Sequence, residues 1–319
     1  MTAKPIPAVA LALVTLASNW SGSRSAATLQ AQGKAVTSLG TMTPIDVPGA
    51  TSTLAVDINV SGAIVGRYLS AGQTHGFLRN PDGEFSTIDV PGAIFTVAGG
   101  INDSGDIVGW YALPTAPAQR HGFLLQDGIF TFVDPPGSTS TNVLSINERG
   151  DIVGRYCTLA ACTAPGTGVF HGFVLRDGAF TIIDVPGAAE TIPFGISGSG
   201  RIAGGFLLDH SAADLFVLNK DEFVTITLPG GQPVSFDKGG LNERGDVVGF
   251  YCDAMLPPCS LAPTGIHGFL ISGGAFTPID IPGATATGAA GINARGDVVG
   301  AYSNDARFFH GYLLSRWVY

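Results

Sequence analysis

Short runs of alternating hydrophobic and polar residues, separated by turn-forming residues, follow one another along most of the chain. Within residues 95–134, four such runs cover 95–102, 105–111, 121–125 and 130–134. Short runs rich in β-branched and aromatic residues are typical of β-strands. No long segment has the period of an amphipathic helix. The pattern predicts an all-β protein, and the four strands of one unit are called a, b, c and d below.

The residues between these strands predict tight hairpins. The a-to-b connection is Asn-x-x-Gly in five units, starting at Asn59, Asn102, Asn147, Asn242 and Asn293, and Ser197 takes the place of Asn in one unit. The c-to-d connection contains Asp-Gly at residues 127–128 and 177–178. Glycine allows the positive φ angle that such turns require, and Asp-Gly is a strong signal for a two-residue hairpin.

One phrase, Ile-Asp-Val-Pro-Gly or a variant of it, marks the end of each unit. Its six copies occupy residues 45–49, 88–92, 133–137, 183–187, 226–230 and 279–283, spaced 43 to 53 residues apart. Four strands per unit at this period are the signature of a β-propeller. A parallel solenoid, which uses shorter units, is the minor alternative. We therefore expect a six-bladed β-propeller of four-stranded antiparallel blades.

The two ends of the repeat region complement each other. The last unit reaches residues 310–314 and lacks a strand d, whereas the copy at 45–49 has no strands a to c before it. An open ring would expose a strand edge that could pair with other chains. The sequence therefore predicts that the N-terminal strand completes the last blade and closes the ring.

The hairpin register predicts a repeated contact between strands c and d. Counting outward from the c-to-d turn places a His opposite an Asp in four units, and the predicted closure of the ring extends the pattern to His310 with Asp46. In the fourth unit Asp214 replaces the His and Thr227 replaces the Asp, and this joint change is what a cross-strand contact predicts. Five equivalent pairs favour a structural role over catalysis, because an active site needs one pair beside a nucleophile. The expected structural pairs are His75 with Asp89, His121 with Asp134, His171 with Asp184, His267 with Asp280 and His310 with Asp46.

The units as a whole resemble a known repeat. The sequence Gly-Ile-Asn-x-x-Gly-Asp-Ile-Val-Gly followed by His-Gly-Phe-Leu is similar to the HAF repeats of extracellular bacterial proteins, with Gly in place of the central Ala. The resemblance covers about residues 41 to 314. It implies an extracellular location and a repeat fold, and it transfers no catalytic residues.

Composition and the N-terminal sequence indicate which partners and which cellular location to expect. The net charge of −9 excludes nucleic acid as a partner, because phosphates require a basic patch. Residues 1–27 have the charge, apolar run and small residues of a secretory signal peptide, and the apolar run is too short to cross a membrane. Residues 28–40 are expected to form a linker or N-terminal arm, and residues 41–319 the propeller. We therefore expect a secreted or extracellular protein with no membrane span, and periplasmic or cell-surface locations stay open.

The cysteines are consistent with a secreted protein. The close pairs Cys157 with Cys162 and Cys252 with Cys259 lie in extended b-to-c connections, and each predicts a local disulfide in an oxidising compartment. The cysteine spacing does not favour zinc, and no metal site or cofactor is expected. A shared structural calcium ion at the Asp-rich turns stays an open alternative.

Two groups of residues are candidates for ligand binding. The b-to-c and d-to-a connections share one face and carry nearly all the length variation, so we expect ligands on this loop-rich face. Strand b leads toward it with Arg67, Trp110, Tyr111, Arg155 and Tyr251, although about half of such residues must face the blade core. Near the axis, most units have Gly two residues before the turn Asn. Asp57 is the charged exception to this rule, and the fifth unit also inserts Asp237 and Lys238 nearby, where other units have Ala or Val.

These features favour a binding module over an enzyme. The first hypothesis is a secreted propeller that binds a glycan or an extracellular protein, or that serves as a subunit of an extracellular assembly of unknown oligomeric state. The alternative is a hydrolase or lyase with its site at the channel mouth on the loop-rich face. The lack of one asymmetric set of nucleophile, base and orienting group favours the first.

Overall fold

The computed structural model describes residues 29–30, 32–33, 40–159, 162, 169–208, 213–229, 234, 238–253, 265–305 and 307–315. The predicted signal peptide lies outside these residues, as do Asp237 and Cys259. Every element described is a β-strand, as the alternating pattern predicts.

Four sheets each contain an antiparallel meander of four consecutive strands. The first is β4 (Ser52–Ile58), β5 (Ile64–Ser70), β6 (Gln73–Arg79) and β7 (Phe85–Ile88). The second is β8 (Phe95–Ile101), β9 (Ile107–Ala112), β10 (His121–Gln126) and β11 (Ile129–Phe132). The third is β12 (Ser140–Ile146), β13 (Ile152–Cys157), β14 (His171–Arg176) and β15 (Ala179–Ile183). The fourth is β16 (Glu190–Ile196), β17 (Ile202–Leu207), β18 (Ala213–Asn219) and β19 (Glu222–Thr227).

The remaining strands form one sheet of nine strands, so the hydrogen bonding gives five sheets where the sequence predicts six separate ones. The two meanders in this sheet are joined by a single parallel bridge between Ile266 and Ala286. Its strands are β20 (Gly240–Leu241), β21 (Val247–Cys252), β22 (Ile266–Ser272), β23 (Ala275–Ile279), β24 (Ala286–Ile292), β25 (Val298–Ser303), β26 (His310–Ser315), β3 (Thr41–Ile45) and β2 (Gln32–Gly33).

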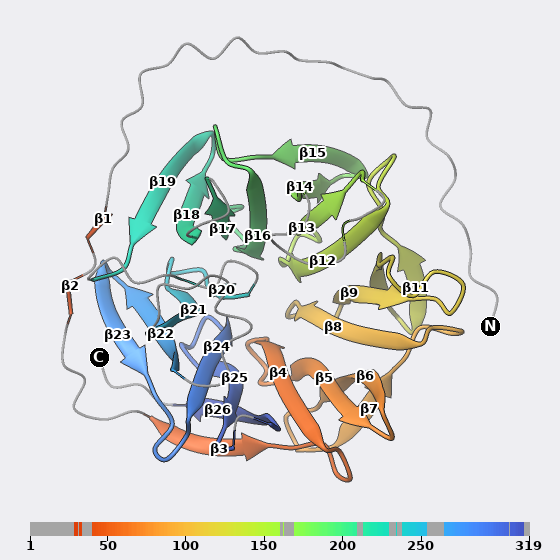
Figure 1. Cartoon of the computed structure of the whole chain (residues 1–319), viewed down its shortest axis with the longest axis horizontal. Helices are drawn as coiled ribbons and strands as arrows, with labels where there is room; N and C mark the ends of the chain where they lie inside the picture. The colour runs from red at the N-terminus through yellow and green to blue at the C-terminus, as the bar shows by residue number, and fades with distance from the viewer. Residues whose placement is uncertain are drawn as a thin grey trace.

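The sheets stand around a common centre, with the first strand of each meander innermost and the last outermost (Figure 1). This arrangement is a β-propeller, which confirms the predicted fold class at that level. The N-terminal strand β3 pairs antiparallel with β26, with Ile45 opposite Gly311. Two short segments of the predicted arm, β1 (Leu29–Gln30) and β2, pair parallel with the outer strands β19 and β23.

The glycine in strand b of each unit has a steric cause. A Cβ on Gly109 in β9 would clash with the carbonyl of Val97 and with the ring of Phe123, and equivalent glycines in the other units face an aromatic ring in the same way. The ring of the His-Gly-Phe segment therefore occupies the space that the strand-b glycine leaves empty. Phe77, Phe123, Phe173, Phe216 and Phe269 are all fully buried in this way.

The phrase at the end of each unit forms a turn between sheets. In the second copy, the N–H of Ala93 donates to the carbonyl of Val90 at 3.0 Å, and Gly92 has a φ of 81°. Pro followed by a Gly of positive φ is typical of a type II turn. The N–H of Val90 also donates to Oγ1 of Thr96 at 3.1 Å. This bond ties the turn to the first strand of the next sheet.

Candidate functional site

The five predicted His–Asp pairs are all in contact. Nδ1 of each His lies 2.7 to 3.1 Å from a carboxylate oxygen of its Asp. The His side chains are 24–43 % exposed and the Asp side chains 31–52 % exposed. At such exposure each pair contributes less than about 1 kcal/mol. The five pairs repeat around the molecule as cross-strand contacts.

Each of these His residues also packs against a tyrosine from strand b. The ring centroids of Tyr111 and His121 are 5.6 Å apart, and those of Tyr251 and His267 are 5.2 Å apart. Both tyrosines are buried, at 6 % and 8 % exposure. Burial raises the pKa of Tyr111 to about 12, with a smaller contribution from the charge of Asp134. The two candidates therefore belong to the packing around the His–Asp pairs.

Two other candidates from strand b are also buried. Trp110 packs in a core cluster with Val97 and Leu144. Arg155 is 4 % exposed, its Nε donates to Oδ1 of Asn142 at 3.4 Å, and its guanidinium lies 4.8 Å from the ring centroid of Phe170. Neither side chain is presented to a ligand at the surface.

The disulfide prediction is confirmed for one pair. Cys157 and Cys162 are bonded to each other. Cys252 is also disulfide-bonded, and its predicted partner Cys259 lies outside the described residues. The bond between Cys157 and Cys162 is compatible with an extracellular location.

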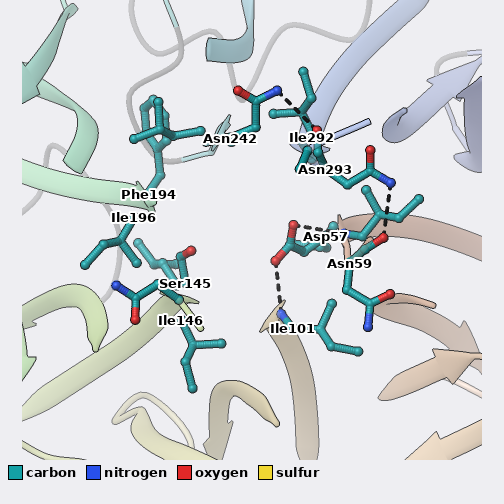
Figure 2. A pocket seen from close by; sticks show the side chains of 18 of the residues that line it. Asp57, Asn59, Ile101, Ser145, Ile146, Phe194, Ile196, Asn242, Ile292 and Asn293 are labelled. Atoms are coloured by element: carbon teal, nitrogen blue, oxygen red, sulfur yellow. Dashed lines mark hydrogen bonds between the residues drawn. The ribbon is translucent and has the colours of Figure 1, made fainter. Parts of the chain in front are cut away.

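One end of the central region has a hollow lined by polar groups, which we call the turn-side hollow because the a-to-b turns surround it. Asp57 points into it from β4, and Ser145 faces it from β12 (Figure 2). The Asp57 carboxylate accepts hydrogen bonds from the N–H of Ile58 at 2.9 Å and from the N–H of Ile101 at 3.0 Å. The second bond joins two neighbouring sheets.

The surroundings of Asp57 change its acidity. Burial raises the pKa of Asp57 to about 7, and the charges of Asp103 and Glu148 add to this rise, although the two backbone hydrogen bonds lower it. A carboxyl group with a pKa near 7 can take up and release a proton at neutral pH. Proton transfer is therefore the chemistry that the turn-side hollow can supply.

Asparagines form a chain of contacts around the same hollow. Each turn Asn donates from Nδ2 to the backbone carbonyl of the corresponding residue in the next unit, as Figure 2 shows for Asn242 to Asn293 (3.1 Å) and Asn293 to Asn59 (3.1 Å). These asparagines were predicted only as turn residues. Their contacts between sheets depend on how close neighbouring sheets lie in space, and the sequence does not specify this distance. The other donors are Asn59, Asn102 and Asn147, with bonds of 3.0 to 3.3 Å.

The opposite end has a second hollow, which we call the loop-side hollow. Its lining includes residues early in strand a and late in strand b, so it lies toward the loop-rich face. Arg67 from β5, Lys238 before β20 and Phe250 from β21 all line it. Two of the predicted ligand-binding residues, Arg67 and Lys238, are thus brought to one place. Asp57 lines the other hollow, so the predicted inner charges do not form one polar pocket.

Small residues of β24 and β25 create the space for the loop-side hollow. Ala301 occupies the position that Arg67, Trp110, Arg155 and Phe250 occupy in four other units, and the fourth unit has Gly205 there. Gly288, which faces it from β24, lacks a Cβ, and one placed there would only touch the ring of Phe250 at 3.5 Å. A small residue where four other units have a large one could have indicated this hollow. The sequence analysis considered only the large residues, so it did not predict the hollow.

Metal and membrane features can be stated for the part of the chain that the structure covers. Within those residues, no three His, Cys, Asp or Glu side chains are gathered in a way that could hold a metal ion. The same residues include no helix that could cross a lipid bilayer.

Comparison with known proteins supports the fold. No family model matches the sequence, and no curated protein matches it either. Solved structures do match. A protein assigned as TolB from Agrobacterium tumefaciens has a TM-score of 0.54 at 13 % identity, with 83 % of this chain and 91 % of that chain covered. A luciferin-regenerating enzyme has a TM-score of 0.50 at 11 % identity, covering 87 % and 95 %.

A lectin from Aleuria aurantia, in complex with α-methyl-L-fucoside, has a TM-score of 0.50 at 12 % identity and covers 83 % of this chain and 93 % of its own. The arrangement of the sheets and these likenesses define this chain as a β-propeller protein. At 11–13 % identity these likenesses establish the fold and no particular activity.

Proposed function

We propose that this protein is a secreted binding module that receives part of a glycan or of an extracellular protein in the loop-side hollow. The observation that carries the proposal is the convergence of Arg67, Lys238 and Phe250 on one hollow beside the loop-rich face. Arginine and aromatic side chains are frequent anchors of recognition surfaces. A role as a subunit of an extracellular assembly would use the same face.

We also propose that the propeller has six blades and that β3 closes the ring. The nine-stranded sheet divides naturally into two meanders, because a single bridge between Ile266 and Ala286 joins them. Closure is supported by the pairing of β3 with β26 and by the hydrogen bond from Asn293 to the carbonyl of Asn59. The repeat units and the predicted signal peptide support membership of the HAF-repeat family and secretion.

The alternative is a hydrolase or lyase. The enzyme and the lectin among the solved structures show that this fold serves both catalysis and binding. Asp57, with its pKa near 7, favours the alternative, since it could act as a general acid or base. It lies in the turn-side hollow, however, away from the loop-rich face. Binding is therefore the better supported function.

The test is a screen of the mature protein against a glycan array and a set of extracellular proteins. Any ligand found is then measured against Ala301→Phe, which fills the loop-side hollow with the side chain that Phe250 provides in the preceding unit. We expect at least a tenfold loss of affinity. The matched control is Ala179→Phe, since Ala179 is an exposed residue at the start of β15.

Two results would count against the proposal. A ligand that binds Ala301→Phe as well as the wild type would place the site elsewhere. Turnover of a substrate that is lost in Asp57→Asn and kept in Ala301→Phe would support the enzyme.

A further inference from the structure

Both ring nitrogens of His267 contact a carboxylate. Nδ1 of His267 lies 2.8 Å from Oδ1 of Asp280, and its Nε2 lies 3.2 Å from Oδ2 of Asp253. Asp253 is the second residue after Tyr251, at a position where the other units have uncharged residues. These residues are Ser70, Leu113, Thr158, Leu208 and Asn304. The fifth unit therefore adds a second carboxylate to the repeated His–Asp pair.

The protonation state of His267 decides whether both contacts are hydrogen bonds. A neutral imidazole has one N–H group and an imidazolium has two, whereas an ionised carboxylate only accepts hydrogen bonds. The neutral ring therefore donates to one carboxylate, and the lone pair of its other nitrogen faces the second. Asp253 is more exposed than Asp280, at 67 % against 52 %, and the contact with Asp280 is the one that the other units share. We therefore expect the neutral ring to lose Asp253.

The groups around His267 favour its protonated form. The ring of Tyr251, from β21, stacks on the imidazole at a centroid distance of 5.2 Å, and burial raises the pKa of this tyrosine, so it is uncharged near neutral pH. The sequences of β24 and of residues 254–264 contain no Asp, Glu, His, Lys or Arg. Burial lowers the pKa of His267, but the hydrogen bonds to Asp280 and Asp253 and their charges raise it by more. The pKa of His267 is therefore above its ordinary value.

Asp253 begins the b-to-c connection of the fifth unit, on the loop-rich face. The backbone N–H of Asp253 donates to the carbonyl of Gly265 at 3.0 Å, and the N–H of Gly265 donates to the carbonyl of Thr285 at 3.2 Å. These bonds join the two ends of the connection to each other and to the next unit. A Cβ added at Gly265 would lie 3.2 Å from Oδ2 of Asp253, so the carboxylate lies close against this residue. The contact with His267 therefore attaches the base of the connection to β22.

We propose that Asp253, His267 and Asp280 form a pH-dependent clamp that holds the base of this connection to its sheet. Protonated His267 binds both carboxylates, and loss of its proton releases Asp253 while the contact with Asp280 stays. Because the pKa of His267 is raised above the ordinary 6.5, the clamp contributes fully to stability below pH 6.5, and its contribution is lost as the pH rises through the pKa of the folded state. The clamp goes beyond the proposed binding function and requires no ligand.

The test follows the ring nitrogens of His267 by NMR in the full secreted chain, with His267→Gln to identify the resonances. Both nitrogens should carry a proton at low pH, and Nδ1 alone at high pH. Asp253→Asn should move the titration of His267 to lower pH, because the amide removes one of the two negative charges. Asp221→Asn, which removes the same charge from the exposed c-to-d turn of the fourth unit, is the control and should leave the titration unchanged.

Hydrogen exchange of the Gly265 amide reports on the base of the connection independently. Its protection factor should fall about two- to fivefold as the pH rises through the measured pKa of His267, the range expected for a partly exposed ion pair. In Asp253→Asn the protection factor should stay constant over this pH range. In Asp221→Asn it should fall as in the wild type.

The outcomes are distinct from those of the ligand screen. A titration of His267 that is the same in Asp253→Asn as in the wild type overturns the clamp, as does a wild-type protection factor that does not vary with pH. Circular dichroism melts establish whether Asp253→Asn is folded, and if it is not, the wild-type protection factor decides alone. Failure of the clamp leaves ligand binding intact, since other residues line the loop-side hollow.

Discussion

Asp57 is the residue whose chemistry differs most from that of its counterparts. Four other units have Gly at this position, and the third has Ser145. A Cβ on Gly291 would clash with the main chain of Asp57, so the inner strands approach closely at this level. The carboxyl group therefore occupies a crowded, partly buried place. Its two backbone hydrogen bonds do not offset the cost of burying its charge, since its pKa lies near 7.

The raised pKa makes stability depend on pH in a predictable direction. The Asp57 carboxyl group binds its proton more tightly in the folded chain than in the unfolded chain, where its pKa is 3.8, so ionisation destabilises the fold as pH rises from 3.8 to about 7. Asp57→Asn removes this loss. The free energy of unfolding of the variant, relative to the wild type, should rise by roughly 2 kcal/mol between pH 5 and pH 8.

Urea unfolding at several pH values measures this difference. Asp82→Asn, which removes an exposed carboxylate from a c-to-d turn, is the control for the loss of one negative charge. A difference for Asp57→Asn that stays constant with pH would mean that Asp57 is ionised in the folded protein throughout this range.

At the scale of the element, the a-to-b turn connects neighbouring sheets as well as neighbouring strands. The side chain of each turn Asn also accepts a hydrogen bond within its own turn, as Oδ1 of Asn147 does from the N–H of Asp151 at 2.9 Å. The same residue donates to the carbonyl of Ser197 in the next unit at 3.0 Å. Ser197 cannot continue the chain, because its shorter side chain bonds to Ser199 within its own turn at 2.8 Å.

This interruption predicts a stabilising substitution. Ser197→Asn should supply the missing donor to the carbonyl of Asn242 and raise the free energy of unfolding by about 1 kcal/mol. Four residues after the turn Asn, four units have Asp, whereas the turn of Ser197 has Arg201. Asn59 makes the equivalent bond although its turn has Ala63 at this position, so the bond does not require the Asp.

The urea midpoint at constant m-value measures the effect. The reverse substitution, Asn147→Ser, should lower stability by about 1–2 kcal/mol because it removes an existing bond between sheets. A lower midpoint for Ser197→Asn would show that this turn does not accept the Asn geometry.

At the scale of the whole molecule, the strand β3 from the first part of the repeat region pairs with the last strand, β26. β3 pairs with β26 over five residue pairs, and the N–H of Thr53 donates to the carbonyl of Phe309 at 2.8 Å. Ile45 is 1 % exposed and packs in a cluster with Phe77 and Val299. The pair of His310 and Asp46 lies beside them but is close to half exposed. The attachment of β3 to β26 therefore depends on the strand pairing and on apolar packing more than on the ion pair.

Two substitutions compare the contribution of the apolar packing with that of the ion pair. Ile45→Ala should lower the free energy of unfolding by about 2–4 kcal/mol, because it leaves a cavity in a buried cluster. Asp46→Ala should lower it by less than about 1 kcal/mol, because the pair is solvated. Chemical unfolding followed by tryptophan fluorescence gives both values. An Ile45→Ala variant as stable as the wild type would mean that β3 contributes nothing to the cooperative fold.

The sequence was sufficient for features that depend on neighbours a few residues apart along the chain. Side-chain alternation places the strands, glycines place the turns, and a tight hairpin determines which residues face each other, so His121 and Asp134 could be paired from their numbers alone. The same reasoning could not tell that Trp110 and Arg155 are buried, since it does not state which face of strand b meets the adjacent sheet.

What the sequence determined by itself is the all-β repeat, the hairpin register and the four His–Asp contacts that lie across a hairpin. Only the tertiary structure decided that Arg67, Lys238 and Phe250 line one hollow while Asp57 lines another. The physical reason is that these residues come from different units, and their meeting depends on how whole sheets pack around the centre. Local hydrogen-bond patterns and turn preferences do not specify that packing.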